Sequence, residues 1–278
     1  MKNIKFICLL FASFTLLSSS CKKESIKVYS KIYGQWQQAN GLYGETVNCF
    51  AQYGKNIFVG TEDSGVFKSS NNGSSWTNIG LTNISVHALA VKGDTIFAGS
   101  WNSGVFLSTN NGASWHAINN GLPYLYNDWS TVININALVI KGDNIFAGTY
   151  IDGIFLSTNN GGKWNQVVDN LSVTSFAVSG NNIFALLENN RVISLSDDGN
   201  WRSMGIVLPA NVSINALAIY NTNIIVGIDQ GVYCSSNNGN NWVPMNNGLP
   251  DNISINAIAI SGDTIFAGTN GYGVWRNF

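Results

Sequence analysis

One pattern of about 40 residues occurs six times along this 278-residue chain, and it limits the possible folds more than any other feature. Each copy begins with a short segment rich in β-branched and small residues, passes through a Gly-containing turn into a second apolar segment, and later reaches a Trp. The first segments are Val47–Ala51, Val86–Ala90, Ile135–Val139, Val173–Ala177, Ile214–Ala218 and Ile255–Ala259. The second segments are Ile57–Gly60, Ile96–Gly99, Ile145–Gly148, Ile183–Leu186, Ile224–Gly227 and Ile265–Gly268. The Trp residues are Trp36, Trp76, Trp115, Trp164, Trp201 and Trp242.

Every copy predicts four short antiparallel strands, which we name a to d in chain order. Segments of β-branched and apolar residues alternate with Gly, Asn and Asp turns, and no helical period occurs in them. Four strands in about 40 residues are typical of one blade of a β-propeller. The second segment is apolar on both faces, which indicates an inner strand enclosed between neighbouring blades. The sequence therefore predicts an all-β, six-bladed β-propeller over residues 34–278, with four antiparallel strands per blade.

The phase of the repeat predicts how the ring closes. Trp36–Gln38 reads as a d strand with no a, b or c strand before it. The chain ends in Gly273–Arg276, which reads as a c strand with no d strand after it. We therefore expect the N-terminal strand to complete the last blade, which would leave no exposed seam in the ring.

A second motif lies between strands c and d in four of the copies. Asn-Gly in each copy supplies the positive φ angles of a tight hairpin, and the preceding Ser and Asn can bond local amides. The pattern Ser-x-Asn-x-Gly-x-x-Trp closely resembles the Asp-box, or BNR, repeat, with Asn in the Asp place. A fifth copy, Leu195–Trp201, lacks the Ser and one residue. The four complete copies are Ser69–Trp76, Ser108–Trp115, Ser157–Trp164 and Ser235–Trp242.

This resemblance implies a fold more than a function. Asp-box propellers include sialidases, some other glycoside hydrolases, receptor ectodomains and photosystem assembly factors. In that family the box is a structural hairpin away from the ligand face, with its Trp fastening the turn to the blade. No catalytic residue is therefore carried over to this chain.

The N-terminus predicts export. Residues 1–20 have a short basic start and the apolar run Phe6–Leu17, which is shorter than the roughly 20 residues that cross a bilayer and suits a signal peptide. Leu17–Cys21 resembles the lipobox of bacterial lipoproteins, although Ser18 stands where Leu is usual. The resemblance implies that Cys21 carries lipid and anchors the protein to a membrane of the cell envelope. A plain secretory signal with an incidental Cys is the alternative.

Residues 21–33 would then form a polar tether. Its charged start, Lys22-Lys23-Glu24, resembles the export signals of some surface-displayed lipoproteins, which implies surface exposure. Cys49 and Cys234 fall on different strand types of non-adjacent blades, so we expect buried free thiols instead of a disulfide.

The charge balance excludes one class of partner. Fourteen Lys and Arg stand against fifteen Asp and Glu, which gives a net charge of −1 and no basic field for nucleic acid. We expect no metal, because hard cations prefer several carboxylates and the turns mostly offer amides. We also expect no cofactor and a monomeric protein.

An enzyme is the weaker interpretation. A sialidase-like site needs three converging Arg, whereas Arg191, Arg202 and Arg276 fall on parts of the repeat that cannot meet. His87 and His116 have no partner in motif spacing, so a structural role is expected for both. A glycan-active hydrolase or lyase with two carboxylates is the alternative. Its candidate carboxylates lie in the b-to-c turns, although acidic residues in turns are more often simply solvated: Glu62, Asp63, Asp152, Glu188 and Asp229.

Aromatic residues gather on the face opposite the box motif. A long d-to-a connection contains Pro123–Trp129, and the b-to-c turns add further aromatics on the same face. Such loops on a rigid scaffold favour stacking on sugar rings or a protein interface, although the insertion's aromatics can also serve to pack it down. The sequence thus predicts a non-enzymatic, envelope-anchored binding or scaffold module for a protein or glycan. Its expected ligand-binding residues are Trp101, Tyr124, Tyr126, Trp129, Tyr150, Asp152 and Tyr272.

Overall fold

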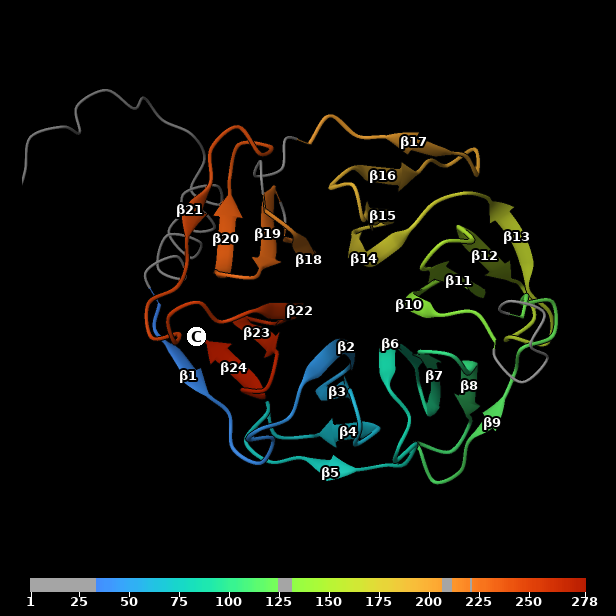
Figure 1. The fold of residues 1–278 in the computed structure, drawn as a ribbon, viewed down its shortest axis with the longest axis horizontal. Helices are drawn as coiled ribbons and strands as arrows, with labels where there is room; N and C mark the ends of the chain where they lie inside the picture. The colour runs from blue at the N-terminus through green and yellow to red at the C-terminus, as the bar shows by residue number, and fades with distance from the viewer. Residues whose placement is uncertain (1–33, 125–131, 207–211, 221) are drawn as a thin grey trace, which may run out of the picture.

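The computed structural model consists of six four-stranded antiparallel sheets arranged around a central axis (Figure 1). The residues that it describes are 34–124, 132–206, 212–220 and 222–278. Each sheet is one blade, with strand a nearest the axis and strand d outermost. This confirms the predicted all-β, six-bladed propeller. The predicted signal peptide, Cys21 and the tether lie outside the described residues, as do Tyr126 and Trp129.

The strands follow the repeat closely. The a strands are β2 (Val47–Tyr53), β6 (Val86–Lys92), β10 (Ile135–Lys141), β14 (Val173–Ser179), β18 (Ile214–Tyr220) and β22 (Ile255–Ser261). The b strands are β3 (Asn56–Thr61), β7 (Thr95–Ser100), β11 (Asn144–Thr149), β15 (Asn182–Leu187), β19 (Asn223–Ile228) and β23 (Thr264–Thr269). The c strands are β4 (Val66–Ser69), β8 (Gly104–Ser108), β12 (Ile154–Ser157), β16 (Val192–Leu195), β20 (Gly231–Ser235) and β24 (Val274–Asn277). The d strands are β5 (Thr77–Asn78), β9 (His116–Ala117), β13 (Asn165–Val168), β17 (Trp201–Ser203), β21 (Val243–Pro244) and β1 (Trp36–Gln38).

The core lies between the blades, and the b strands are buried over nearly their whole length. Their alternating residues face two neighbouring blades, which explains the apolar runs of the sequence. At the end of the b strand, Gly99 lies so close to Ile135 of the next blade that an added Cβ would stand 2.4 Å from its side chain. Glycine is therefore needed for this approach of the two sheets.

The c-to-d hairpins have one geometry in the four copies with a complete motif. In the first, the Ser69 hydroxyl accepts the Gly73 amide at 2.9 Å and Asn71 accepts the Ser75 amide at 2.9 Å. Asn72 has a φ angle of 56°, as the Asn-Gly turn requires. The same bonds recur in the hairpins that begin at Ser108, Ser157 and Ser235.

Three Trp residues at the start of d strands also join neighbouring blades through a hydrogen bond. The Trp115 indole donates to the carbonyl of Ile79 in the preceding blade at 2.8 Å, and Trp164 donates likewise to Ile118 at 2.7 Å. Trp36 donates to the Met245 carbonyl. At the seam of the ring, the buried Nε1 of Trp76 has no hydrogen-bond partner. These bonds connect the outer edges of successive blades. The motif had implied only that the Trp fastens the turn to its own blade.

The ring closes with the N-terminal strand, as predicted. β1 pairs with β24, with Trp36 opposite Asn277 and Gln38 opposite Trp275 (Figure 1). The innermost strands β2 and β22 are also in contact, so the first and last blades pack like any other pair. The two ends of the propeller thus meet where a sixth c-to-d hairpin would stand.

Cys49 and Cys234 are buried free thiols, as predicted. Burial raises the pKa of both thiols, that of Cys234 to about 11. Both therefore stay protonated and unreactive at neutral pH. Within the described residues, no helix is long and apolar enough to cross a membrane.

Candidate functional site

The antiparallel order gives the propeller two different faces. Strands a and c run toward one face, which carries the a-to-b turns and the c-to-d hairpins; we call it the hairpin face. Strands b and d run toward the other, which carries the b-to-c turns and the d-to-a connections; we call it the mouth face. The predicted ligand residues that the structure describes, Trp101, Tyr124, Tyr150, Asp152 and Tyr272, fall on the mouth face.

A cavity of about 460 Å³ opens at the axis on the mouth face. Its walls come from all six blades, so no single repeat contains the site. The lining mixes amides, hydroxyls, two aromatic rings, one imidazole and one carboxylate. The lining residues are Asn48, His87, Trp101, Asn136, Tyr150, Ser172, Thr174, Glu188, Ser213, Ile214, Asn215 and Asn256.

The inner wall is a ring of polar side chains, one from each a strand. Each stands second in its strand, where the neighbours on either side are apolar or small and mostly buried. Our sequence interpretation missed this ring. Its signal was a polar residue recurring at one position of an otherwise apolar strand in all six copies. The members are Asn48, His87, Asn136, Thr174, Asn215 and Asn256.

A second ring surrounds the first and consists of the residue that follows each b strand. The chain turns here, and in five of the six blades the amide of this residue bonds the carbonyl of the residue before strand a, as in Trp101 to Ser85 at 3.0 Å and Tyr150 to Asn134 at 3.3 Å. Three of these side chains, Trp101, Tyr150 and Glu188, line the cavity. The members are Glu62, Trp101, Tyr150, Glu188, Asp229 and Asn270.

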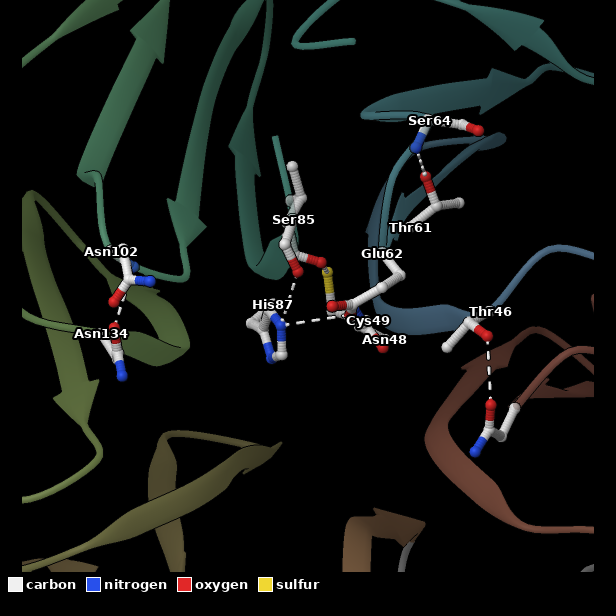
Figure 2. A network of polar contacts seen from close by, with 12 residues as sticks. Thr46, Asn48, Cys49, Thr61, Glu62, Ser64, Ser85, His87, Asn102 and Asn134 are labelled. Atoms are coloured by element: carbon white, nitrogen blue, oxygen red, sulfur yellow. Dashed lines mark hydrogen bonds and ion pairs between the residues drawn. The ribbon is translucent and has the colours of Figure 1, made fainter. Parts of the chain in front are cut away.

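The two rings are joined by hydrogen bonds in the first two blades (Figure 2). The Glu62 carboxylate accepts the Asn48 amide at 2.7 Å and lies 3.4 Å from Nε2 of His87. The Ser85 hydroxyl lies 2.8 Å from the same nitrogen. Partial burial lowers the pKa of His87 from 6.5, and the attraction of Glu62 only partly offsets this. The imidazole is therefore neutral at pH 7.

The aromatic residues of the site form a row. The ring centroids of His87 and Trp101 are 5.4 Å apart, and those of Trp101 and Tyr150 are 5.8 Å apart. Trp101 and Tyr150 keep 40% and 42% of their surface exposed. They therefore offer ring surface to a ligand at the cavity rim.

The other predicted ligand residues stand apart from this row. Tyr272, in the sixth blade, is exposed, and its carbonyl accepts the Gln38 amide. Asp152 lies outside the cavity lining, and its pKa is raised by partial burial. Tyr124 is exposed and pairs with Val132 across the insertion. The structure thus brings Trp101 and Tyr150 together and leaves Tyr272 and Asp152 elsewhere on the same face.

Within the described part of the chain, the carboxylates and Arg residues do not form an assembled catalytic group. Asp229 accepts the Asn215 amide at 2.9 Å and the Ser254 hydroxyl at 3.1 Å, so it is bound to the wall like Glu62. Arg202 pairs with Asp198 and Arg276 bonds Asn72, both on the hairpin face. Among the described residues no group of three or more His, Cys, Asp and Glu is placed to hold a metal ion.

The opposite end of the axis has different chemistry. A cavity of about 600 Å³ opens there on the hairpin face. It is lined mainly by apolar side chains at the ends of the a strands, among them Phe50, Phe176, Leu217 and Ile258. The axis therefore opens through a polar cavity on one face and an apolar cavity on the other, and two of the predicted ligand residues, Trp101 and Tyr150, line the polar one.

Comparison with known proteins identifies the fold but no family. No protein-family model matches the chain, and no curated protein matches it. Among solved structures, Ycf48 from Cyanidioschyzon merolae aligns at 13% identity over 88% of this chain and 98% of its own, with a TM-score of 0.64. Ycf48 has also been solved bound to D1 peptide, and that structure aligns at 11% identity over 88% and 94%, with a TM-score of 0.58.

Two longer proteins also contain a similar propeller. The GH74 xyloglucanase from Xanthomonas campestris aligns at 16% identity over 83% of this chain and 44% of its own, with a TM-score of 0.55. The extracellular domain of the one-component system BT4673 from B. thetaiotaomicron aligns at 18% identity over 88% and 40%, with a TM-score of 0.57. This chain thus spans less than half of either protein. Identities this low show a shared β-propeller fold, found in binding proteins and in hydrolases alike.

Proposed function

We propose that this protein is a non-enzymatic binding or scaffold module whose protein or glycan ligand sits in the cavity of the mouth face. The observation that carries the proposal is the pair of exposed rings, Trp101 and Tyr150, beside a cavity lined by amides and hydroxyls. Stacking surface next to a few polar groups is typical of ligand sites. Ycf48 bound to D1 peptide is a propeller of this kind with a peptide ligand.

The alternative is a glycan-active hydrolase, which the likeness to a GH74 xyloglucanase favours. Such an enzyme needs one carboxylic acid and one carboxylate across the scissile bond. Glu62 and Asp229 are each hydrogen-bonded to the cavity wall, and Asp152, whose pKa is raised, lies outside the cavity. This arrangement supports binding over turnover.

The first prediction concerns the two rings. We expect Trp101→Ala with Tyr150→Ala to weaken ligand binding tenfold or more, because each stacked aromatic contributes on the order of 1 kcal/mol beyond its burial. Titration calorimetry on hits from a glycan array and a peptide library measures this. The exposed Tyr53, on the hairpin side of β2, provides the control Tyr53→Ala. Reproducible glycan hydrolysis that a single carboxylate substitution abolishes would establish the enzyme instead.

We further propose that the propeller belongs to the Asp-box group and is exported and anchored through lipid on Cys21. The four hairpins with one hydrogen-bond pattern support the first point. The likeness to an extracellular domain supports export. β1 starts at the hairpin face, opposite the end of β24, so a lipid on Cys21 would connect to that face.

The second prediction tests the anchor. Because a thioether-linked lipid needs the Cys21 sulfur, Cys21→Ser should move the protein from the membrane fraction to the soluble fraction and abolish metabolic labelling with a fatty acid. Cys49→Ser changes a buried thiol and should leave both readouts unchanged. Membrane association that persists in Cys21→Ser would remove the anchor from the proposal.

A further inference from the structure

The two faces of the propeller differ strongly in charge. Of the described cations, the mouth face carries Arg191 alone, and the other seven lie on or near the hairpin face. Of the described carboxylates, eight lie on the mouth face: Glu45, Glu62, Asp63, Asp152, Asp169, Glu188, Asp229 and Asp251. A net charge near zero for the whole chain therefore conceals an acidic mouth face.

These eight carboxylates are not neutralised within the described part of the molecule. The two ion pairs that involve Lys or Arg there, Lys92 with Asp143 and Arg202 with Asp198, both lie on the hairpin face. On the mouth face, the carboxylate of Glu62 lies near the imidazole of His87. Because this imidazole is neutral at pH 7, it does not neutralise the charge of Glu62. Unpaired like charges on one face raise the local concentration of oppositely charged partners.

The cavity itself favours a hydrogen-bond donor. The side-chain amide nitrogens of three lining residues bond the wall: Asn48 to Glu62 at 2.7 Å, Asn136 to the Val173 carbonyl at 3.1 Å, and Asn215 to Asp229 at 2.9 Å. Because each partner is an acceptor, the orientation of each amide is determined. The three amide oxygens receive no hydrogen bond from the described residues and remain available as acceptors.

The aromatic row of His87, Trp101 and Tyr150 also favours a positively charged donor. Trp and Tyr faces attract cations, and Trp101 and Tyr150 stand at a cavity that also contains the exposed carboxylate of Glu188. Acceptor oxygens, ring faces and a carboxylate together match a group that only donates hydrogen bonds and is positively charged. The ammonium of Lys and the guanidinium of Arg are such groups.

We propose that the ligand of the mouth is a basic segment of a protein, with a Lys or Arg side chain inserted beside Trp101 and Tyr150 and its flanking positive charges facing the surrounding carboxylates. A peptide is favoured over a small amine because the acidic residues are distributed over all blades except the second, wider than one small molecule can contact. This inference rests on the proposed binding function and names the class of ligand.

The test compares two libraries of 12-residue peptides on the full-length protein in detergent. In the first library every peptide contains two Arg or Lys; in the second these are replaced by citrulline and acetyl-lysine, which keep the shape and lose the charge. We expect hits from the first library only, with an affinity that falls at least tenfold between 50 and 500 mM NaCl. Neutral xyloglucan oligosaccharides serve as the glycan probe.

Two double variants that each remove two charges show which face attracts the basic peptides. Glu188→Gln with Asp229→Asn removes two charges from the mouth face and should weaken the hits at least tenfold. Asp94→Asn with Asp197→Asn removes two charges from the hairpin face and should change affinity less than twofold. Equal binding of charged and neutral libraries, or equal effects of the two double variants, would overturn the inference.

The same experiment separates this inference from the proposed function. Binding of the oligosaccharide or the neutral peptides that is lost in Trp101→Ala with Tyr150→Ala would retain the binding module and refute its basic ligand. If peptides from the charged library bind the Trp101→Ala, Tyr150→Ala double variant as tightly as the wild type, the ligand binds elsewhere and both proposals are refuted.

Discussion

At the scale of the residue, one member of the inner ring differs in chemistry from the other five. Five of the six residues of the inner ring are Asn or Thr, which cannot titrate near neutral pH, and the sixth is His87. Its ring lies against Trp101 and its nitrogen faces Ser85 and Glu62. The imidazole of His87 is thus a titratable group at a position where the other blades have Asn or Thr. Its pKa is lowered mainly by burial.

His87 should make folding stability depend on pH. Its pKa in the folded protein lies below 6.5, so in mildly acidic solution the unfolded chain binds more protons than the folded one. The contribution of His87 to the free energy of unfolding is complete above pH 6.5 and is lost as the pH falls through the lowered pKa. The free energy of unfolding should then fall by at most about 1.4 kcal/mol per pH unit. Urea denaturation between pH 7.5 and 5 measures it.

His87→Asn, which copies the other blades, should reduce this slope. His116→Asn is the matched control, because His116 is exposed at the outer edge. Identical stability curves for His87→Asn and the wild type would show that His87 titrates with the same pKa in the folded and unfolded chains.

At the scale of the element, the outer strands are too short to hold the blades together by themselves. β5, β9 and β21 have two residues each. The indole hydrogen bonds at this edge therefore matter, because they connect the start of one d strand with the carbonyl at the end of the preceding one. The seam residue Trp76, whose Nε1 has no partner, provides a natural reference for their contribution.

Trp115→Phe should cost more stability than Trp76→Phe. Both side chains are half-buried, but only the first substitution leaves a carbonyl, that of Ile79, without its donor. The difference should be about 0.5–1.5 kcal/mol, the usual net contribution of one hydrogen bond, because this bond is only partly buried. Chemical denaturation of the two variants gives the difference directly. A larger loss for Trp76→Phe would contradict the role given to the indole bond.

At the scale of the whole molecule, the ring depends on a strand that lies far from its partner in the sequence. Trp36 of β1 is 2% exposed, packs among residues of the fifth and sixth blades and pairs with Asn277. The first and last blades are also held by the packing of β2 against β22 and by the bond of Arg276 to Asn72. Loss of β1 would expose the edge of β24 along its length.

Two truncations test this closure. A chain that starts at residue 34 keeps β1 and should melt within a few degrees of a chain that starts at residue 21. A chain that starts at residue 39 loses β1 with the buried Trp36, and we expect a destabilisation of about 3–5 kcal/mol and a clearly lower Tm. Calorimetry measures both, and equal melting temperatures would rule out closure by this strand.

The sequence by itself determined the fold, because every blade repeats the same local signals. Apolar strands, Asn-Gly turns and a regularly spaced Trp recur six times, and the repeat phase at Trp36 and Trp275 specified the closure. It also indicated which face carries Trp101 and Tyr150, since strand direction follows from strand order. These are local properties of the chain, and they need no knowledge of contacts between blades.

The assembled site was decided only by the tertiary structure. The inner ring takes one residue from each of six strands, the first and last of which, Asn48 and Asn256, lie far apart in the sequence. The meeting of His87, Trp101 and Tyr150 depends on how far each blade is rotated about the axis. The rotation follows from packing between blades, as at Gly99 against Ile135, and no single repeat encodes it.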